Sequence, residues 1–417
     1  MDMEAIMNNT MLTKYAKLVV EVGVNLQKGD TLVINCTHEG LELARKISQQ
    51  AYLAGARKVE LMFSDEQMAL LNYTYMSEQD LTTLDKWYVD RYNHLVDTRC
   101  CYISILAEDP DVFENVDPLL LAKVSRARHV ALQKYFNAAT SNLIRWCLCA
   151  VPNDNWAKKI FPTLTPSQAN RKLWDMIFKT MRLDQPNPVK AWQNHIQRLA
   201  DLSEFLTNSK FCKFELTNSL GTNLSVGMPK GYYFSGGHEN SQDGIGFTAN
   251  MPTEEVFSLP DKHNVGGIVY SALPLIHNGS CVDKFWIKFE NGKIVDYDAK
   301  VGKDTLKGII ESDEGSHYLG EIAFVQYDSP IRNLGTLFYN TLFDENASCH
   351  LAIGEAYPMI TGIENMSKSE QEKAGVNSSC THVDFMYGTK DMSVVGVKEN
   401  GERVDIIKDG NFVCLSK

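Results

Sequence analysis

The stretch that decides the fold of the first half is residues 31–63, which read TLVINCTHEGLELARKISQQAYLAGARKVELMF. Residues 31–36 are a run typical of a buried strand, and residues 58–63 predict the next strand. Between them, residues 39–54 have helical spacing and end near Gly55. A strand, a helix and a strand in this order predict two parallel strands joined by a covering helix.

The same alternation continues on both sides of this stretch. Residues 10–25 place apolar side chains on one helical stripe, while residues 101–106 and 144–151 predict two further strands. Residues 167–208 predict two helices separated by a pair of prolines. The first half is therefore expected to be an α/β domain with a mostly parallel sheet.

After about residue 208 the pattern changes to alternating apolar and polar residues separated by turns. Residues 284–298 predict a hairpin around Glu290-Asn291-Gly292-Lys293, and residues 385–415 predict another around Glu399-Asn400-Gly401-Glu402. We therefore expect an N-terminal α/β domain over residues 1–207 and a β-rich α+β domain over residues 208–417. A chain of 417 residues commonly forms two such domains.

Composition and charge limit the classes of function. The chain is 44% hydrophobic and 22% charged, as expected of a globular protein. It carries 52 acidic and 41 basic residues, a net charge of −11. This balance argues against a protein that generally binds nucleic acid or anionic membranes, because binding either of these partners requires a basic face on the protein.

The cysteines and the N-terminus indicate a reduced, cytoplasmic protein. No two of the ten cysteines have CxxC spacing, so a zinc site built from cysteine thiolates is not favoured. The first residues lack the pattern of a secretory signal, and no apolar stretch approaches the length of a membrane span.

The second half carries a set of metal-ligand side chains, whereas the common nucleotide, serine-hydrolase and HExxH motifs are absent. The clearest pattern is Thr381-His382-Val383-Asp384-Phe385. Residues i and i+2 of a strand share a face, so His382 and Asp384 are expected to project together. An imidazole and a carboxylate on one face can bind a divalent ion, and an exposed polar strand face is the alternative.

Three more stretches supply similar side chains. Glu345 and His350 stand in a loop-like stretch, which an acidic turn before a buried histidine would also explain. Glu254 and Glu255 lie between two prolines, which favours a stiff loop that presents acids; a helix start is the alternative. Glu321 opens an apolar strand, where a carboxylate costs desolvation unless it is paired, metal-bound or solvated at the strand end.

Together these residues provide at least four carboxylates and two imidazoles. That mixture suits hard-to-borderline divalent ions such as zinc, cobalt, manganese or magnesium. It is typical of two-metal hydrolases, in which a bridging water becomes the nucleophile.

Four segments of the second half resemble the thermophilic aminopeptidase family of metallopeptidases, of the aminopeptidase T, aminopeptidase S and PepS type. They are MPTEEVFSLPDKHNVGGIVYSALPL, LGEIAFVQYDSPI, FYNTLFDENASCHLAIGEAYP and THVDFMYGT, within about residues 250–392. The first half resembles the family more loosely, although its layout and the total length agree.

The resemblance implies two divalent metal ions per subunit and a set of ligands. The implied ligands are Glu255 (with Glu254 as its nearest competitor), Glu321 as the bridge, Glu345, His350, His382 and Asp384. Tyr357 is implied to hydrogen-bond the reacting carbonyl, and Glu255 or Glu321 to move the proton.

The implied activity is release of N-terminal amino acids from peptides with a free N-terminus, by a homodimer. Two other classes stay open from the residues alone. Another two-metal hydrolase, such as a phosphoesterase, would need basic residues for phosphate, of which Lys262 and Arg332 are the nearest. A non-catalytic peptide-binding protein would not require the full ligand set.

Overall fold

The computed structural model describes residues 3–277 and 280–415 of the chain. It divides into two compact units, each with its own internal contacts. The first consists of Met1–His195 with His238–Pro252, and the second of Ile196–Gly237 with Thr253–Lys417. The domain bounds predicted from the sequence, 1–207 and 208–417, remain a prediction.

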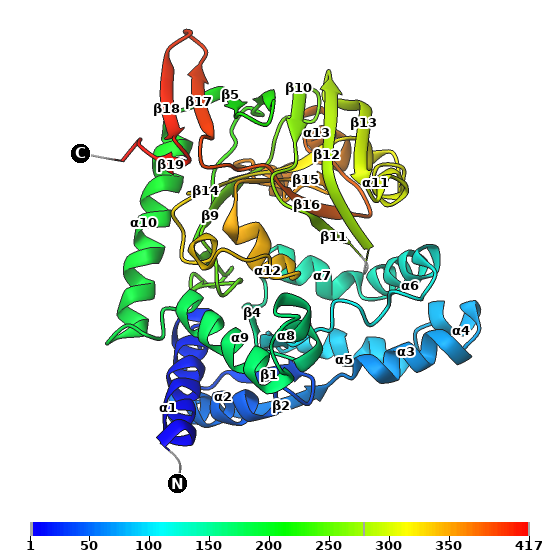
Figure 1. Ribbon diagram of the computed structural model, residues 1–417, viewed down its shortest axis with the longest axis vertical. Helices are drawn as coiled ribbons and strands as arrows, with labels where there is room; N and C mark the ends of the chain where they lie inside the picture. The colour runs from blue at the N-terminus through cyan, green and yellow to red at the C-terminus, as the bar shows by residue number, and fades with distance from the viewer. Residues whose placement is uncertain (1–2, 278–279, 416–417) are drawn as a thin grey trace. The chain divides into compact units, whose positions relative to one another are not determined.

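The first unit contains the predicted parallel sheet. Its strands are β1 (Thr31–Cys36), β2 (Lys58–Phe63), β3 (Cys101–Leu106) and β4 (Trp146–Ala150). They lie in the order β2-β1-β3-β4, and each neighbouring pair is parallel (Figure 1). The strand–helix–strand order predicted for the first half is confirmed. The connections between the strands are long enough to contain a helix, which allows neighbouring strands to run parallel.

The helices predicted within residues 39–54 and 167–208 begin and end close to those positions, whereas no helix was predicted between residues 66 and 160. The first helix differs most: it begins earlier than residue 10 and ends in a π-helical turn, Val19–Gly23. The helices are α1 (Met3–Leu18), α2 (Leu41–Leu53), α3 (Glu66–Tyr75), α4 (Glu78–Thr82), α5 (Lys86–Asp97), α6 (Pro118–Ala131), α7 (Gln133–Thr140), α8 (Asp154–Ile160) and α9 (Pro166–Thr180). α10 (Pro188–Asn208) follows the predicted prolines, and the short strands β7 (Glu239–Asn240) and β8 (Gly246–Phe247) pair in the returning segment.

The second unit is rich in strands, as predicted, and contains two sheets. The larger sheet runs β11-β12-β10-β6-β5-β17-β18-β19, with β13 paired to β12; the smaller runs β16-β15-β14-β9. The larger sheet comprises β5 (Phe211–Thr217), β6 (Asn223–Gly227), β10 (Val265–Tyr270), β11 (Leu275–His277), β12 (Ser280–Glu290), β13 (Lys293–Val301), β17 (Ser393–Lys398), β18 (Arg403–Lys408) and β19 (Asn411–Phe412). The smaller comprises β9 (Glu255–Ser258), β14 (Leu319–Val325), β15 (His350–Gly354) and β16 (His382–Met386). The helices of this unit include α11 (Lys303–Ile310), α12 (Thr341–Asp344) and α13 (Lys368–Lys373).

The two predicted hairpins are confirmed. β12 and β13 pair antiparallel on either side of Asn291 and Gly292, whose φ angles are 50° and 84°. Asn-Gly tolerates this left-handed conformation, which matches the twist of the flanking strands. β17 and β18 form the second hairpin.

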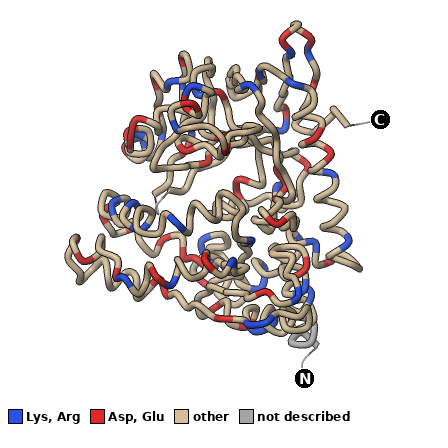
Figure 2. The backbone as a smooth tube through the Cα atoms, turned by 180° about the vertical axis from the view of Figure 1, so that it is seen from behind, with Lys and Arg blue, Asp and Glu red and all other residues tan. Residues whose placement is uncertain are grey.

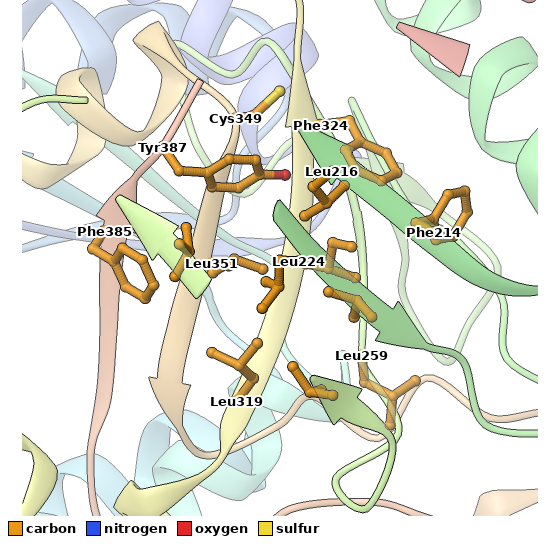
Figure 3. Packing of buried hydrophobic residues seen from close by; sticks show 14 of the residues in the cluster. Phe214, Leu216, Leu224, Leu259, Leu319, Phe324, Cys349, Leu351, Phe385 and Tyr387 are labelled. Atoms are coloured by element: carbon orange, nitrogen blue, oxygen red, sulfur yellow. The ribbon is translucent and has the colours of Figure 1, made fainter. Parts of the chain in front are cut away.

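The two sheets of the second unit share one apolar core. The ring of Phe214 on β5 lies 5.1 Å from that of Phe324 on β14, and Phe285 on β12 lies 5.7 Å from Phe385 on β16. Figure 3 shows Phe324, Leu351 and Phe385 in this packing. One face of the smaller sheet is thus committed to the core, which leaves its other face to carry different side chains.

Charged residues of both signs are interspersed along the described chain (Figure 2). Among the described residues, no helix combines the length and the apolar character needed to cross a lipid bilayer.

Candidate metal centre

The candidate site is built on the face of the smaller sheet that points away from the core. Directly opposed residues of antiparallel strands share a face, and Ala352 on β15 opposes Glu321 on β14 and Asp384 on β16. Alternation along each strand puts further side chains on this face. The set is Glu255, Phe257, Glu321, Ala323, Val325, His350, Ala352, Gly354, His382, Asp384 and Met386.

A first group of ligand atoms gathers around His350. Its Nε2 lies 3.1 Å from Oε2 of Glu255 and 3.3 Å from Oε1 of Glu321. All three residues are buried, and each offers one ligand atom within 4.8 Å of the others. This group has the size and donor types of a divalent-ion site.

A second group gathers around His382. Its Nε2 lies 3.3 Å from Oδ1 of Asp384 and 3.7 Å from Oε2 of Glu321. These three residues also offer ligand atoms within 4.8 Å of one another. Glu321 therefore belongs to both groups and presents one carboxylate oxygen to each histidine.

Two alanines leave room for these side chains to meet. Ala352 separates Glu321 from Asp384 across the strands, and Ala323 separates Phe257 from His350. Adjacent strands lie about 4.8 Å apart, so side chains two strands apart can converge only above a small residue. The alanines thus form part of the floor of the site.

The electrostatics of the two ligand groups favour the binding of a cation. Burial raises the pKa of Glu321, and burial together with the charge of Asp384 raises the pKa of Glu345 well above its usual value. Burial alone would lower the pKa of His382, but Asp384 and Glu321 raise it to about 10. The pKa of His350 is also held well above its usual value, because the nearby carboxylates of Glu255 and Glu321 outweigh the effect of burial. Without a cation the carboxylates thus retain protons on the imidazoles.

Backbone carbonyls orient both histidines. Nδ1 of His350 lies 3.1 Å from the carbonyl oxygen of Ser348, and Nδ1 of His382 lies 2.8 Å from that of Glu355. A proton on Nδ1 would donate to the carbonyl and leave the Nε2 lone pair facing the carboxylates. This is the usual arrangement behind metal-binding histidines. The sequence offered no sign of it, because any residue can supply a backbone carbonyl.

The structure brings five of the six predicted ligands into the two groups, and Glu345 lies near but outside them. The charges of Asp384, Glu255, His350 and Glu321 all act on Glu345. Tyr357, which is 37% exposed, has its ring 5.7 Å from the ring of His382. Each predicted site residue thus lies at or beside the same sheet face.

Two local predictions were wrong. The stretch between the two prolines is neither a stiff loop nor a helix start at Glu255, because Glu255–Ser258 pairs with β14 as strand β9. The loop-like stretch before His350 contains α12 and the short 3-10 helix Glu345–Ala347. In the first case the strand partner is distant in sequence, so local patterns could not reveal the pairing.

Asn346 is a positioning residue that the residue patterns did not single out. It is fully buried; its side-chain oxygen accepts a hydrogen bond from the backbone N–H of Glu254 at 2.8 Å, and its amide donates to the carbonyl of Leu342. The side-chain nitrogen of Asn346 lies 3.4 Å from Oε1 of Glu345. Asn346 therefore joins the Glu255 segment to the Glu345 segment.

The donor set fits divalent metal ions. Oε2 of Glu255 and Oδ1 of Asp384 are buried and lack a hydrogen-bond partner of good geometry, although each faces an imidazole nitrogen. Buried carboxylate atoms of this kind are costly unless a cation compensates them. Carboxylates and imidazoles together suit several first-row divalent ions.

Comparisons with known proteins agree with this chemistry. The family model described as thermophilic metalloprotease (M29) matches residues 8–412. The chain is 40% identical over 402 residues to aminopeptidase AmpS of Bacillus subtilis, covering 96% of this chain and 98% of that protein. It is 39% identical over 404 residues to aminopeptidase 2 of Geobacillus stearothermophilus, covering 96% and 97%.

A solved structure extends the agreement to the fold. Wild-type AmpT from Thermus thermophilus superposes with a TM-score of 0.90 at 30% identity, covering 97% of this chain and 99% of that chain. An α/β first half followed by strand-rich antiparallel sheets is thus shared along nearly the whole length. The chain belongs to the thermophilic metalloprotease (M29) family, and it is a metal-dependent aminopeptidase.

Proposed function

We propose that the enzyme binds two divalent ions, one in each ligand group, with the Glu321 carboxylate between them. The observation that carries this proposal is that Oε1 of Glu321 lies 3.3 Å from Nε2 of His350 while Oε2 lies 3.7 Å from Nε2 of His382. A carboxylate whose two oxygens serve two separate groups is the usual bridge of two-metal hydrolases.

The proposed ligands divide by group. Glu255, Glu321 and His350 hold one ion, and Glu321, His382 and Asp384 hold the other. Glu345, whose carboxylate is under the influence of both groups, completes the set. Zinc, cobalt, manganese and magnesium all accept some combination of these oxygen and nitrogen donors.

Ions held by these residues would lower the pKa of a water molecule and polarise the scissile carbonyl. The residues of the chain do the remaining work. Tyr357 donates a hydrogen bond to the carbonyl oxygen as negative charge develops on it. Glu255 or Glu321 transfers the proton of the attacking water to the leaving amine.

The substrates are peptides with a free N-terminus, whose α-amino group would sit on a metal ion or on a carboxylate of this face. Binding that amine at the site places the first peptide bond at the ligands, which explains the release of one residue at a time.

We also infer a cytoplasmic homodimer. The homodimer is implied by the resemblance to the family. All ten cysteines are free thiols, and six of them are buried, which fits a reducing compartment. Size-exclusion chromatography with light scattering tests the dimer.

The metal-free protein, reloaded with each ion in turn, tests the activity. It should hydrolyse aminoacyl-nitroanilides only after reloading, and N-blocked analogues should resist it. His382→Ala should lose one ion per chain and nearly all activity. Hydrolysis of blocked substrates, or normal turnover by His382→Ala, would contradict the proposal.

A further inference from the structure

Phe257 is a large apolar side chain on the face that carries the ligands. It follows Glu255 by two positions on β9, so both side chains leave the strand in the same direction. Ala323 opposes Phe257 on β14, and His350 opposes Ala323 on β15. Two strand spacings, about 10 Å, thus separate the backbones of Phe257 and His350.

The Phe257 ring is partly buried and held in place by its neighbours. One part of the side chain packs against the apolar core of the second unit. The ring also lies 6.0 Å from the ring of Tyr357 in an edge-on arrangement, and the Tyr357 ring lies 5.7 Å from that of His382. The three rings therefore form a continuous row that leads from the edge strand to the second ligand group.

We propose that Phe257 and Tyr357 form the wall that receives the side chain of the first residue of the substrate, so that apolar N-terminal residues such as leucine, methionine and phenylalanine are preferred. This inference rests on the proposed function, because it requires the free amine and first carbonyl to lie at the ligands. It assigns Phe257 a role in specificity and none in the chemical step.

Three observations support this role. The other large apolar side chains that the register places on this face, Val325 and Met386, are buried, whereas Phe257 is partly exposed; the remaining positions are the ligand carboxylates and imidazoles, Gly354 and the two small alanines. A substrate side chain directed toward the ligands would meet charge, whereas one directed toward β9 meets an aromatic surface. The core holds Phe257 in place, so little ordering cost is paid when a substrate binds.

The competing explanation is that Phe257 only positions Tyr357. Loss of a positioning contact would lower kcat for every substrate by the same factor. Loss of a side-chain wall would instead lower kcat/KM for large apolar residues and spare alanine. The ratio of kcat/KM for leucyl-nitroanilide to that for alanyl-nitroanilide separates the two.

The test compares the metal-loaded wild type with Phe257→Ala, Phe257→Leu and Phe412→Ala. Phe412 is the matched control, because it is also a partly buried strand residue packed against the same core. Phe257→Ala should lower the leucine-to-alanine ratio about tenfold or more, since pocket contacts of this size change specificity by that order. Phe257→Leu, which keeps much of the apolar volume, and Phe412→Ala should leave the ratio within about threefold.

Binding measurements supply a second readout that does not depend on turnover. Calorimetry with L-leucine and L-alanine should show that Phe257→Ala weakens leucine binding about tenfold and leaves alanine binding unchanged. Metal content should stay at the wild-type value. An equal loss for both amino acids, or an unchanged ratio, overturns the inference. A wild type that hydrolyses no free-amine substrate in the same assay would instead contradict the proposed function itself.

Discussion

Replacing Ala352 with valine is expected to damage metal binding while leaving the fold intact. Ala352 is fully buried and opposes Glu321 on one side and Asp384 on the other. The two carboxylates come from strands about 10 Å apart and reach the same group above this residue. Valine favours a strand conformation, so the substitution should leave the backbone in place. Its two added methyl groups instead fill space above the sheet.

The size of the effect follows from the crowding. Adding methyl groups to a filled site costs about 1–3 kcal/mol, because neighbouring side chains must leave their preferred positions. If that cost is paid when Glu321 and Asp384 converge on an ion, affinity falls roughly 5–150-fold. The ion shared by Glu321, His382 and Asp384 should be affected first.

Titration of the metal-free protein with cobalt or zinc in a calorimeter measures this change directly. Ala157→Val is the control, because Ala157 is equally buried but lies on α8 of the first unit. It should lower the melting temperature without changing metal affinity. Wild-type affinity and stoichiometry in Ala352→Val would refute the idea that the alanine floor makes room for the ligands.

Three further predictions concern single side chains. Glu321→Gln should lower the metal content measured by mass spectrometry at both groups, whereas loss confined to one group would argue against a shared bridge. Tyr357→Phe should lower kcat about 10²–10³-fold with little change in KM, as expected when one donor to a developing oxyanion is removed; unchanged kcat would remove Tyr357 from the mechanism. Hydrogen bonds from Arg403 and Lys213 lower the pKa of Glu215 from 4.5 to about 2. Because the folded pKa is the lower one, this stabilisation is present above about pH 4.5 and is lost as the pH falls toward 2. Glu215→Gln should therefore lower the free energy of unfolding by about 1 kcal/mol at pH 7, as for a partly exposed pair, and the difference should vanish near pH 2; a difference that persists there would show that another contact is responsible.

Much of the fold could be predicted from local patterns. The apolar run Thr31–Cys36 and the Asn-Gly turn at residues 291–292 each specify their own conformation, and both predictions were confirmed. The strand at His382–Met386 was also evident from alternation. In these cases a few consecutive residues contain the whole signal.

The parts that were missed depend on partners distant in the sequence. The Glu255 segment is short and contains two adjacent acids, and it becomes a strand because β14, some 65 residues later, pairs with it. The convergence of Glu255 with His350 likewise depends on the order β16-β15-β14-β9. Ala352, Asn346 and Phe257 have ordinary residue types, so their positions on or beside the ligand face become evident only from the register.

The most direct test of the central claim is a crystal structure of the zinc- or cobalt-loaded enzyme with anomalous difference maps collected at the metal edge. Two peaks about 3.5–4 Å apart are expected, one beside His350 and one beside His382, with the carboxylate of Glu321 between them. A single peak, or peaks away from Glu321, would show that Glu321 does not join two metal ions.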